Sequence, residues 1–497
     1  MPPDVIVCGG GLGGLTAAAY LVQQGVKVTL IEAQPHVGGY AIAFKRDDFI
    51  FDVALHAIPA GQPGQPFHQL IADLGLSDKV RFLKLKEAFR VKLGTFEFVI
   101  PNDFENFFIE LIKHFPAEAE GLARLRIDLL KYASLYFHTL ENNPGLWHIT
   151  SRFIPRIPTF LKHTRISTRT YLDQFVSDPT CKAILYQAAV FFGIPMKQFP
   201  AINFLIMFYL LFTTGMHTIQ GGGQALTDAL LERITQKGGE VITGRPVGRI
   251  IMNKNMAVAV RLRDGSERGA TAFVSNINTP CLVKHLIGES NLPMTYVKAL
   301  RQLRPSLSIL QMHLGLDCRV QDLGITRHIS IIFPDEDMDR AMEEQNSSAQ
   351  LEGFSLLAPG ITDPRPQAQN ERVLSIVGGV SADAWLNLDE DKYRQLKQKT
   401  SEHILALIER EYPGIKKHIR TIDLATPHTF RRYTENPNGA ILGFDTSLGM
   451  HRTIMKISRF PIRNVFLANA WTSKLGGFMQ CTKAGMLAGE RVLKYLQ

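Results

Sequence analysis

A cluster of glycines near the start of the chain constrains its fold more than any other feature. The segment DVIVCGGGLGGL contains the spacing G-x-G-x-x-G at Gly9, Gly11 and Gly14. A short apolar run, Val5–Cys8, precedes it, and an alanine-rich stretch, residues 15–24, follows it. A strand, a glycine turn and a helix in this order are typical of a dinucleotide-binding βαβ unit. In such a unit the diphosphate approaches bare backbone at the helix N-terminus.

The next apolar run indicates which dinucleotide this unit binds. Residues 26–31 predict the second strand, and Glu32 follows it directly. A carboxylate at this position accepts hydrogen bonds from ribose hydroxyls and repels a 2′-phosphate. The glycine motif alone is weak evidence, but here it stands in register with both strands, the helix and the acidic residue. The sequence therefore predicts a dinucleotide site that disfavours NADP.

A second glycine pair, Gly38-Gly39, narrows the choice of cofactor. Its position after Glu32 resembles the extended dinucleotide motif of FAD enzymes of the amine oxidase and phytoene desaturase superfamily. An arginine often follows the pair in those enzymes, whereas this chain has Tyr40. The later segment 373–381 lacks the third glycine and the closing acidic residue, and we interpret it as a strand of another domain. The resemblance implies FAD as the cofactor and a single nucleotide-binding fold.

Further motifs extend this resemblance over most of the chain. The longest, ATPHTFRRYTENPNGAILGF at residues 425–444, closely resembles the pattern T-P-x-T-x-x-R-Y-T-x-N-P-x-G-A-x-Y-G. Shorter ones are FIFDVALHAI (residues 49–58), similar to F-D-x-G-x-H, the segment beginning GGGQAL at residue 221, and VSNIN at residues 274–278. Together they resemble the phytoene desaturase, carotenoid isomerase and retinol saturase group.

The resemblance implies an α/β architecture: a Rossmann-type FAD-binding domain joined to a discontinuous α+β substrate domain. Residues 1–91, 220–285 and 425–497 would form the FAD-binding domain. Residues 92–219 and 286–424 would form the substrate-binding, membrane-facing domain. With 497 residues the chain is too long for one compact core. An apolar helical face at residues 104–115 and a long helix at residues 391–412 fall in the second domain.

The same resemblance implies the residues that contact FAD. They are the glycines and their neighbours, Gly9, Gly11, Gly13, Gly14, Glu32, Ala33, Gly38, Gly39 and Tyr40, and more distant positions, Val247, Asn469, Ala470 and Met479. The catalytic candidates are His56, which matches the histidine of F-D-x-G-x-H, and Tyr433 and Glu435 in residues 425–444. Glu435 would serve as acid or base if the reaction moves a proton. Purely structural roles remain the alternative for His56 and Glu435.

Composition excludes several classes of function. The net charge of +9 suggests an anionic partner, but no lysine- and arginine-rich block or nucleic-acid motif occurs, so no nucleic-acid partner is predicted. The five scattered cysteines and the histidine spacing predict neither disulfides nor a metal site. The first apolar run starts at Val5, and no stretch reaches the length of a membrane span. We expect a cytoplasmic protein.

Two segments suggest contact with lipid. Residues 200–216, PAINFLIMFYLLFTTGM, form the most apolar stretch, which predicts a buried helix; its function would be to form a wall of a hydrophobic tunnel or a patch that dips into lipid. In residues 147–170, arginines and lysines alternate with Trp, Phe, Ile and Leu. This pattern suits peripheral contact with an anionic membrane, and a solvated basic loop is the alternative.

These observations favour an FAD-dependent oxidoreductase that acts on carbon–carbon bonds of an apolar isoprenoid or polyene lipid of carotenoid or retinoid type. The reaction would be desaturation, saturation or cis–trans isomerisation. Two alternatives stay open: a flavin amine oxidase, and a non-catalytic protein of the flavin fold that binds prenylated partners. The intact glycine motif and Glu32 argue against the non-catalytic protein.

Overall fold

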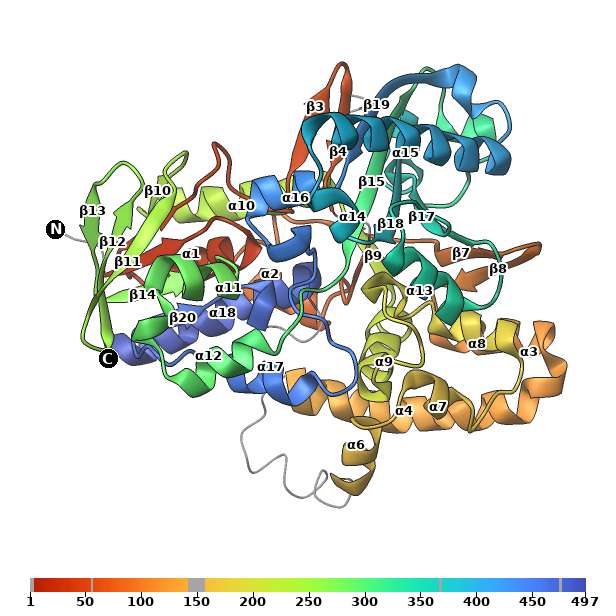
Figure 1. Ribbon diagram of the computed structural model, residues 1–497. Coiled ribbons are helices and arrows are strands. Elements are labelled where there is room, and N and C mark those ends of the chain that lie inside the picture. The colour runs from red at the N-terminus through yellow and green to blue at the C-terminus, as the bar shows by residue number, and fades with distance from the viewer. Residues whose placement is uncertain (1–3, 55–56, 142–156, 366–368, 473–475) are drawn as a thin grey trace.

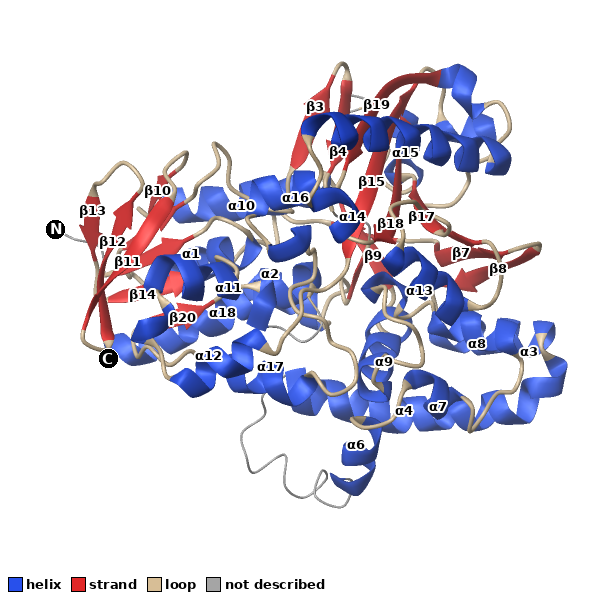
Figure 2. Cartoon of the chain, in the orientation of Figure 1, coloured by secondary structure: helices blue, strands red, loops and turns tan. Residues whose placement is uncertain are grey.

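The computed structural model describes residues 4–54, 57–141, 157–365, 369–472 and 476–497. Figure 1 shows two main sheets in separate halves of the molecule, with both chain ends in the half that holds the glycine motif. A group of helices lies below the second sheet in this view. Helices flank both sheets, as the colouring by secondary structure in Figure 2 makes clear.

The first half contains a five-stranded parallel sheet that is assembled from the beginning, middle and end of the chain. Its order is β10 (Glu240–Ile242), β2 (Val28–Ile31), β1 (Val5–Cys8), β14 (Ala272–Ser275) and β20 (Val465–Leu467). Strands β1, β2 and β14 are fully buried, which explains their unbroken apolar sequences. Three helices pack together over this sheet: α1 (Leu12–Gln23), α10 (Gly222–Gln236) and α18 (Gly477–Leu496).

A smaller antiparallel sheet covers the other side of this half. It consists of β11 (Val247–Asn253), β12 (Met256–Leu262) and β13 (Glu267–Gly269). Its apolar residues share a core with those of α12 (Met294–Arg301) and α17 (His451–Ile457), and the short helix α11 (Thr279–Cys281) follows β14. The five-stranded sheet is therefore covered on both faces, as a parallel sheet requires.

The second half is built on a seven-stranded mixed sheet. Its order is β19 (Ile419–Ala425), β15 (Ser308–Leu316), β18 (Val373–Val380), β17 (Phe354–Leu357), β16 (Ile329–Phe333), β7 (Glu87–Leu93) and β8 (Phe96–Pro101). All neighbours pair antiparallel except β16 and β7. Leu310, Met312 and Leu314 of β15 pack in one core with α15 (Glu390–Glu411). Because side chains alternate along a strand, Ile309, Gln311 and His313 face the opposite side.

The helical group beside this sheet has an aromatic core. It contains α3 (Phe104–His114), α4 (Ala119–Glu141), α6 (Ile157–His163), α7 (Thr168–Leu172), α8 (Pro179–Tyr186) and α9 (Ala201–Phe208), which continues as a π-helical turn at Tyr209–Thr213. Asp103 caps α3 by accepting a hydrogen bond from the backbone N–H of Asn106, and Pro116 follows its end. Phe107 of α3 stacks on Phe212, with ring centroids 4.8 Å apart.

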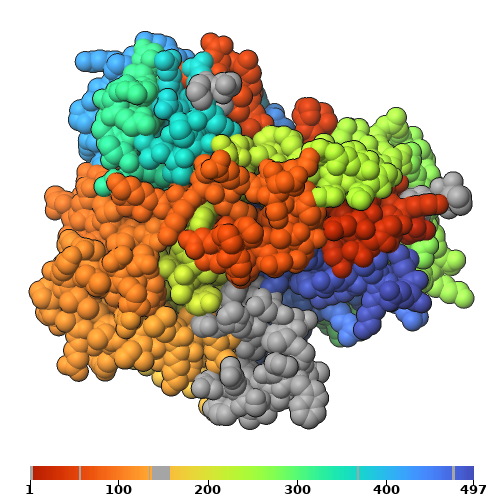
Figure 3. All heavy atoms as spheres, turned by 180° about the vertical axis from the view of Figure 1, so that it is seen from behind, coloured from red at the N-terminus to blue at the C-terminus, as the bar shows by residue number. Residues whose placement is uncertain are grey.

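Further short elements complete the fold. They are the hairpin β3 (Ala43–Arg46) and β4 (Phe49–Asp52), the small sheet β5 (Ile58–Pro59), β9 (Met216–Ile219) and β6 (Phe82–Lys84), and the helices α2 (Pro66–Asp73), α13 (Met338–Ser347), α14 (Asp383–Leu386) and α16 (Pro427–Thr434). In the view from behind, the red and orange N-terminal part of the chain crosses from one half to the other (Figure 3).

The expected α/β fold with a Rossmann-type unit is confirmed. The predicted helix at residues 104–115 appears as α3, the one at residues 391–412 as α15, and segment 373–381 contains β18 of the other sheet. All strands of the parallel sheet come from segments predicted for the FAD-binding domain, whereas the boundary at residue 91 falls inside β7. The exact division into domains stays a prediction. Within the described residues, no helix is long and apolar enough to cross a bilayer.

Candidate functional site

A single large cavity extends from the glycine turn after β1 to the face of β15. Its volume is about 1220 Å³, and it is lined by residues of both halves. Typical sites for small molecules enclose roughly 300–1,000 Å³, so this cavity has room for a dinucleotide and a second ligand. Of the predicted cofactor contacts, all but Gly14 line it. Their roles stay predictions, but the structure brings these distant residues to one place.

The glycine turn leaves no space for side chains. A Cβ atom on Gly13 would lie 1.9 Å from the carbonyl oxygen of Ala468, and one on Gly14 would lie 2.0 Å from the carbonyl oxygen of Gly9. Gly14 therefore acts through close packing of helix on strand, which is the role expected of the third glycine. The N–H of Gly38 donates to the carbonyl of Gly10 over 2.7 Å, which holds the second glycine pair against the first.

Glu32 stands at the carboxyl end of β2, where its carboxylate organises two loops. One oxygen accepts a hydrogen bond from the N–H of Gly10 over 2.6 Å, and the other accepts one from the N–H of Gln34 over 2.8 Å. An ionised carboxylate offers about four acceptor positions, so further bonds to ribose hydroxyls are possible. The position is the one that a dinucleotide fold uses for its ribose-binding acid.

Asn276 follows β14 and belongs to the motif VSNIN, but it was not among the site residues predicted from the sequence. Its side-chain oxygen accepts a hydrogen bond from the N–H of Gly11 over 3.0 Å, and its nitrogen donates to the carbonyl of Ala468 over 2.5 Å. It lines the cavity beside Asn469 and Ala470. One amide thus ties together the N-terminal, central and C-terminal parts of the nucleotide fold.

The segment 425–444 lies against the glycine turn as helix α16 and the loop after it. Tyr40 packs its ring 6.0 Å from that of Phe430, and its hydroxyl is 3.5 Å from the carbonyl of Ala440. Burial raises the pKa of Tyr40, so its hydroxyl stays protonated. The tyrosine that replaces the usual arginine therefore joins this segment to the glycine turn.

Two of the three catalytic candidates lie near Glu32. The side chain of Gln34 donates to the carbonyl of Tyr433 over 3.1 Å, and the carboxylate of Glu435 pairs with Arg263 over 2.8 Å. Both candidates line the cavity, and both are more than half exposed. Glu435 also ends α16 in the left-handed region, at φ +53°. The third candidate, His56, lies outside the described residues.

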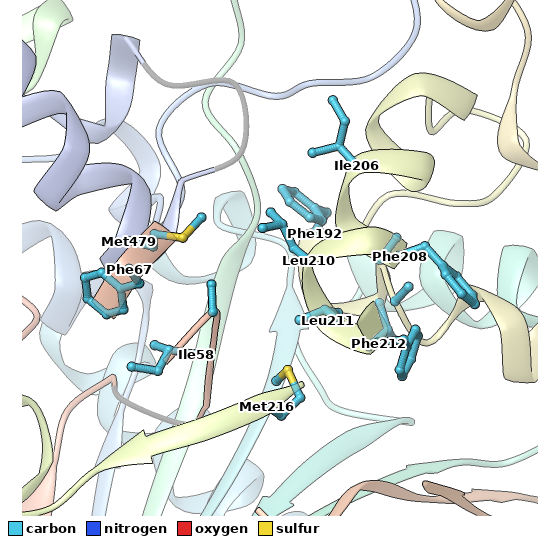
Figure 4. Close-up of a cluster of buried hydrophobic side chains, with 14 of the residues drawn as sticks. Ile58, Phe67, Phe192, Ile206, Phe208, Leu210, Leu211, Phe212, Met216 and Met479 are labelled. Atoms are coloured by element: carbon cyan, nitrogen blue, oxygen red, sulfur yellow. The ribbon is translucent and has the colours of Figure 1, made fainter. Parts of the chain in front are cut away.

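The other end of the cavity is apolar. Figure 4 shows Phe192, Leu210 and Leu211 across a gap from Ile58 and Met479, with Met216 below them. All six line the cavity. Leu210 and Leu211 belong to the apolar segment 200–216, so its predicted place in the wall of a hydrophobic cavity agrees with the structure. Such a wall binds by excluding water from apolar surface and carries no charge.

Two polar side chains interrupt this apolar end, and sequence reasoning missed both. Gln311 and His313 of β15 are 1% and 2% exposed, and both line the cavity. Nδ1 of His313 lies 2.8 Å from the hydroxyl of Ser375, and its ring packs against Phe44 and Phe51. Burial and the nearby Arg46 lower the pKa of His313 to about 3, so it is neutral. The signal was present, because Gln and His alternate with Leu and Met in SILQMHLGL.

The polar groups around the glycine turn fit a bound flavin nucleotide. The side-chain oxygen of Asn469 and the side-chain nitrogen of Gln480, both in the cavity lining, are buried without a hydrogen-bond partner among the described residues. Buried polar atoms are rarely left unpaired, so these two indicate a polar ligand. Helix α18, which carries Gln480, also begins at the cavity with Gly477.

A separate group of possible metal ligands lies outside the cavity lining. Asp317, Cys318 and His418 have their ligand atoms within 4.8 Å of one another. The carboxylate of Asp317 already pairs with Arg420 and with Nδ1 of His418, the latter at 2.8 Å. These contacts occupy both of its oxygens. We therefore interpret Asp317, His418 and Arg420 as a surface ion-pair cluster and not as a metal site.

A Rossmann-type glycine turn that opens into an apolar cavity suits a nucleotide-dependent oxidoreductase. Comparison with known proteins makes the class specific: residues 12–493 match the model of the flavin-containing amine oxidoreductases. The chain belongs to this family, and a flavin is its cofactor.

Individual relatives are distant but cover most of the chain. An all-trans-retinol 13,14-reductase of Danio rerio is 25% identical, with 98% of this chain and 84% of that protein covered. A chloroplastic prolycopene isomerase of an Oncidium hybrid cultivar is 24% identical, covering 88% of this chain and 74% of that protein. An oxidoreductase from Methanosarcina mazei of known structure superimposes with a TM-score of 0.66 at 17% identity, covering 98% and 99% of the two chains. This last likeness concerns the fold alone.

Proposed function

We propose that this protein is an FAD-dependent oxidoreductase that acts on carbon–carbon bonds of an apolar isoprenoid or polyene lipid, by desaturation, saturation or cis–trans isomerisation. One observation carries the proposal: the cavity that begins at the glycine turn and Glu32 continues without a break to the apolar wall of Phe192, Leu210 and Leu211. Nucleotide chemistry and an apolar ligand are thereby brought into one space.

FAD is the form of flavin that the cavity favours. Gly9, Gly11 and Gly13 supply bare backbone for a diphosphate, and Glu32 supplies acceptors for a ribose. FMN has neither a diphosphate nor an adenosine ribose, so these groups favour FAD. Asn469 and Gln480 would hold polar edges of the same cofactor. When bound, a flavin accepts or donates a hydride equivalent.

The chain's own contribution to the reaction is to hold and orient the lipid. A polyene has no charge to bind, so the aliphatic and aromatic wall sets its position and excludes water. Leu210, Leu211 and Met216 are each at most 3% exposed, so this part of the wall is buried away from the protein surface. The catalytic roles of His56, Tyr433 and Glu435 stay predictions.

The names of the distant relatives support a polyene substrate. One reduces retinol and the other isomerises prolycopene, according to their names. Both ligands are long conjugated isoprenoids, and both fit the apolar character of the cavity described above. The two names denote different kinds of reaction, a reduction and an isomerisation. The choice among desaturation, saturation and isomerisation is therefore left to experiment.

The family name keeps a flavin amine oxidase as the alternative, but the charges in the cavity disfavour it. The carboxylates among the described lining residues are Glu32, Asp423 and Glu435. Glu32 binds two backbone N–H groups, Asp423 pairs with Arg46 at 2.7 Å, and Glu435 pairs with Arg263 at 2.8 Å. A protonated amine would thus find no unpaired carboxylate in this part of the lining.

Peripheral contact with an anionic membrane is part of the proposal. On α4, Ile127 and Leu130 are 62% and 39% exposed, and on α6, Ile157 and Leu161 are 37% and 38% exposed. These helices touch through Tyr136, whose hydroxyl is 2.9 Å from Nδ1 of His163. Basic residues, Lys131, Lys162, Arg165 and Arg169, accompany the exposed apolar ones, as at an anionic lipid surface. Residues 147–156 of the predicted segment lie outside the described residues. A cytoplasmic location remains the expectation.

The decisive experiment combines cofactor and substrate. Purified protein should carry visible flavin absorption, and the released cofactor should have the mass of FAD. Incubation in liposomes with phytoene, polycis-lycopene and retinol, with oxidised and with reduced flavin, should change one of them. Product masses then separate loss of two hydrogens, gain of two and isomerisation. Protein that neither contains nor takes up flavin would exclude both enzyme functions and leave the prenyl-binding alternative.

A further inference from the structure

Gln311 and His313 stand two residues apart on β15 and face the cavity together. Their neighbours on the other face of the strand, Leu310, Met312 and Leu314, pack under α15. Ile309 continues the row of cavity-facing residues and is apolar. The strand thus presents one apolar and two polar side chains to a space whose other wall is aliphatic and aromatic.

Both polar side chains have unused hydrogen-bonding capacity. The side-chain nitrogen of Gln311 is buried and has no partner among the described residues. His313 makes one hydrogen bond, through Nδ1 to Ser375, so its Nε2 has no partner within the same part of the chain. An unpaired buried polar group is unfavourable, and a bound ligand that forms a hydrogen bond with it removes that cost.

Two other amides of the cavity lining show the contrast. Gln345 donates to the carbonyl of Gly353 over 3.1 Å, and Asn346 donates to the carbonyl of Gly193 over 2.8 Å. Both amides thus donate hydrogen bonds to backbone carbonyls. These two amides find partners within the protein, whereas among the described residues the side-chain nitrogen of Gln311 and Nε2 of His313 do not, as is also the case for the buried atoms of Asn469 and Gln480 beside the glycine turn.

The charge around the pair selects the kind of ligand group. His313 is neutral, and Arg46, the cation that lowers its pKa, is paired with Asp423, which lies opposite His313 in the strand register. A neutral imidazole and an amide recognise a hydroxyl or a carbonyl oxygen, since each can donate or accept. A carboxylate or an ammonium group would find no net opposite charge here.

We propose that Gln311 and His313 bind a neutral oxygen-bearing group of the substrate, so that the site takes an oxygenated isoprenoid, an alcohol or an aldehyde, in preference to a pure hydrocarbon. This inference rests on the proposed function and names its substrate class. Both residues determine specificity by orientation of the lipid: the apolar wall binds the chain, and the polar pair fixes which end of it lies against β15.

The test compares two ligands that differ by one oxygen atom, all-trans-retinol and its 15-deoxy hydrocarbon. Binding of each to the flavin-loaded protein in detergent micelles is measured by quenching of tryptophan fluorescence. The alcohol should bind about tenfold more tightly, the effect of one hydrogen bond to a buried partner. Gln311→Leu and His313→Phe should each remove most of this preference by weakening the alcohol alone. Ile309→Val, on the same face of the strand, should affect both ligands alike.

The outcomes separate this inference from the proposed function. Equal binding of alcohol and hydrocarbon to the unaltered protein overturns the inference and leaves the proposed function standing. Binding of neither ligand overturns both. Variants that alter the flavin absorption spectrum and leave the ligand preference intact would assign the pair to the cofactor and also overturn the inference. His313→Gln, which keeps a neutral donor and acceptor, should retain more of the preference than His313→Phe and guards against misfolding.

Discussion

The carbonyl oxygen of Ala468 lies only 1.9 Å from the position that a Cβ atom of Gly13 would occupy. The two residues are near opposite ends of the chain, yet they meet at the cofactor end of the cavity. Asn276 bonds to the same carbonyl. The contact means that the glycine turn is complete only when the C-terminal segment is in place.

Gly13→Ala should therefore disrupt more than the turn itself. The added methyl group meets backbone, which yields less than a flexible side chain, so we expect a destabilisation of about 3 kcal/mol or more and loss of bound flavin. Thermal unfolding and the flavin-to-protein ratio measure the two effects. Gly269→Ala is the matched control, because a Cβ atom there would lie 3.4 Å from its nearest neighbour, the carbonyl oxygen of Val258. Equal behaviour of the two variants would contradict this account of the turn.

Glu32→Ala should separate the nucleotide half of the cofactor from its ring. Loss of the acceptor for ribose hydroxyls, and of the bonds to Gly10 and Gln34, should weaken FAD binding about tenfold to a hundredfold. Riboflavin, which has no adenosine ribose, should bind almost as before. Titration of the apoprotein with each ligand, followed by flavin fluorescence, checks this. A similar loss for both ligands would show that Glu32 acts only through the loops.

Tyr433→Phe and Glu435→Gln test the catalytic candidates. Tyr433→Phe keeps the backbone carbonyl that binds Gln34, whereas Glu435→Gln weakens the ion pair with Arg263, so we expect weaker FAD binding in Glu435→Gln and an unchanged rate at saturating cofactor in both variants. Steady-state rates measured at rising FAD concentrations make the distinction. A rate that stays more than a hundredfold low at saturation would establish the catalytic role predicted from the sequence.

His313 should make the protein less stable in mild acid. Its pKa is about 3 in the folded protein and 6.5 without the surroundings. Between these values the unfolded chain binds the extra proton, so the free energy of unfolding falls as the pH drops below about 6, by roughly 1.4 kcal/mol per pH unit. His313→Gln should remove this slope. Urea unfolding of both proteins at pH 4.5, 5.5 and 7 measures it, and parallel curves would be the contrary result.

Asp52 should act in the opposite direction. Burial raises its pKa from 3.8 to about 6, although Arg365 lies 3.3 Å away and lowers it. The folded protein binds the proton more tightly, so this contribution to stability is present at low pH and is lost as the pH rises from about 4 through 6. Asp52→Asn should abolish the loss. Asp52 packs against Gly222 at the start of α10. Thermal melts of both proteins at pH 4, 5, 6 and 7 measure the loss of stability as the pH rises.

Local sequence was sufficient for the elements that carry their own signals. The apolar run Val5–Cys8 and the glycine spacing specified a strand and a turn, and Glu32 was expected at the end of the next strand, because each of these features depends on neighbouring residues. The helix α3 was predictable in the same way, from its apolar face and the proline after it. The composition of segment 200–216 was sufficient to predict its burial, since a stretch this apolar is excluded from water.

The partners of these elements depended on tertiary structure. That Asn276 and Ala468 complete the glycine turn follows from the order of strands β1, β14 and β20, which local pattern does not specify. The alternation in SILQMHLGL determines that Gln311 and His313 share a face, because side chains of a strand point to alternate sides. Only the packing of α15 on the other face decides that this polar face meets the cavity, and with it what the site recognises.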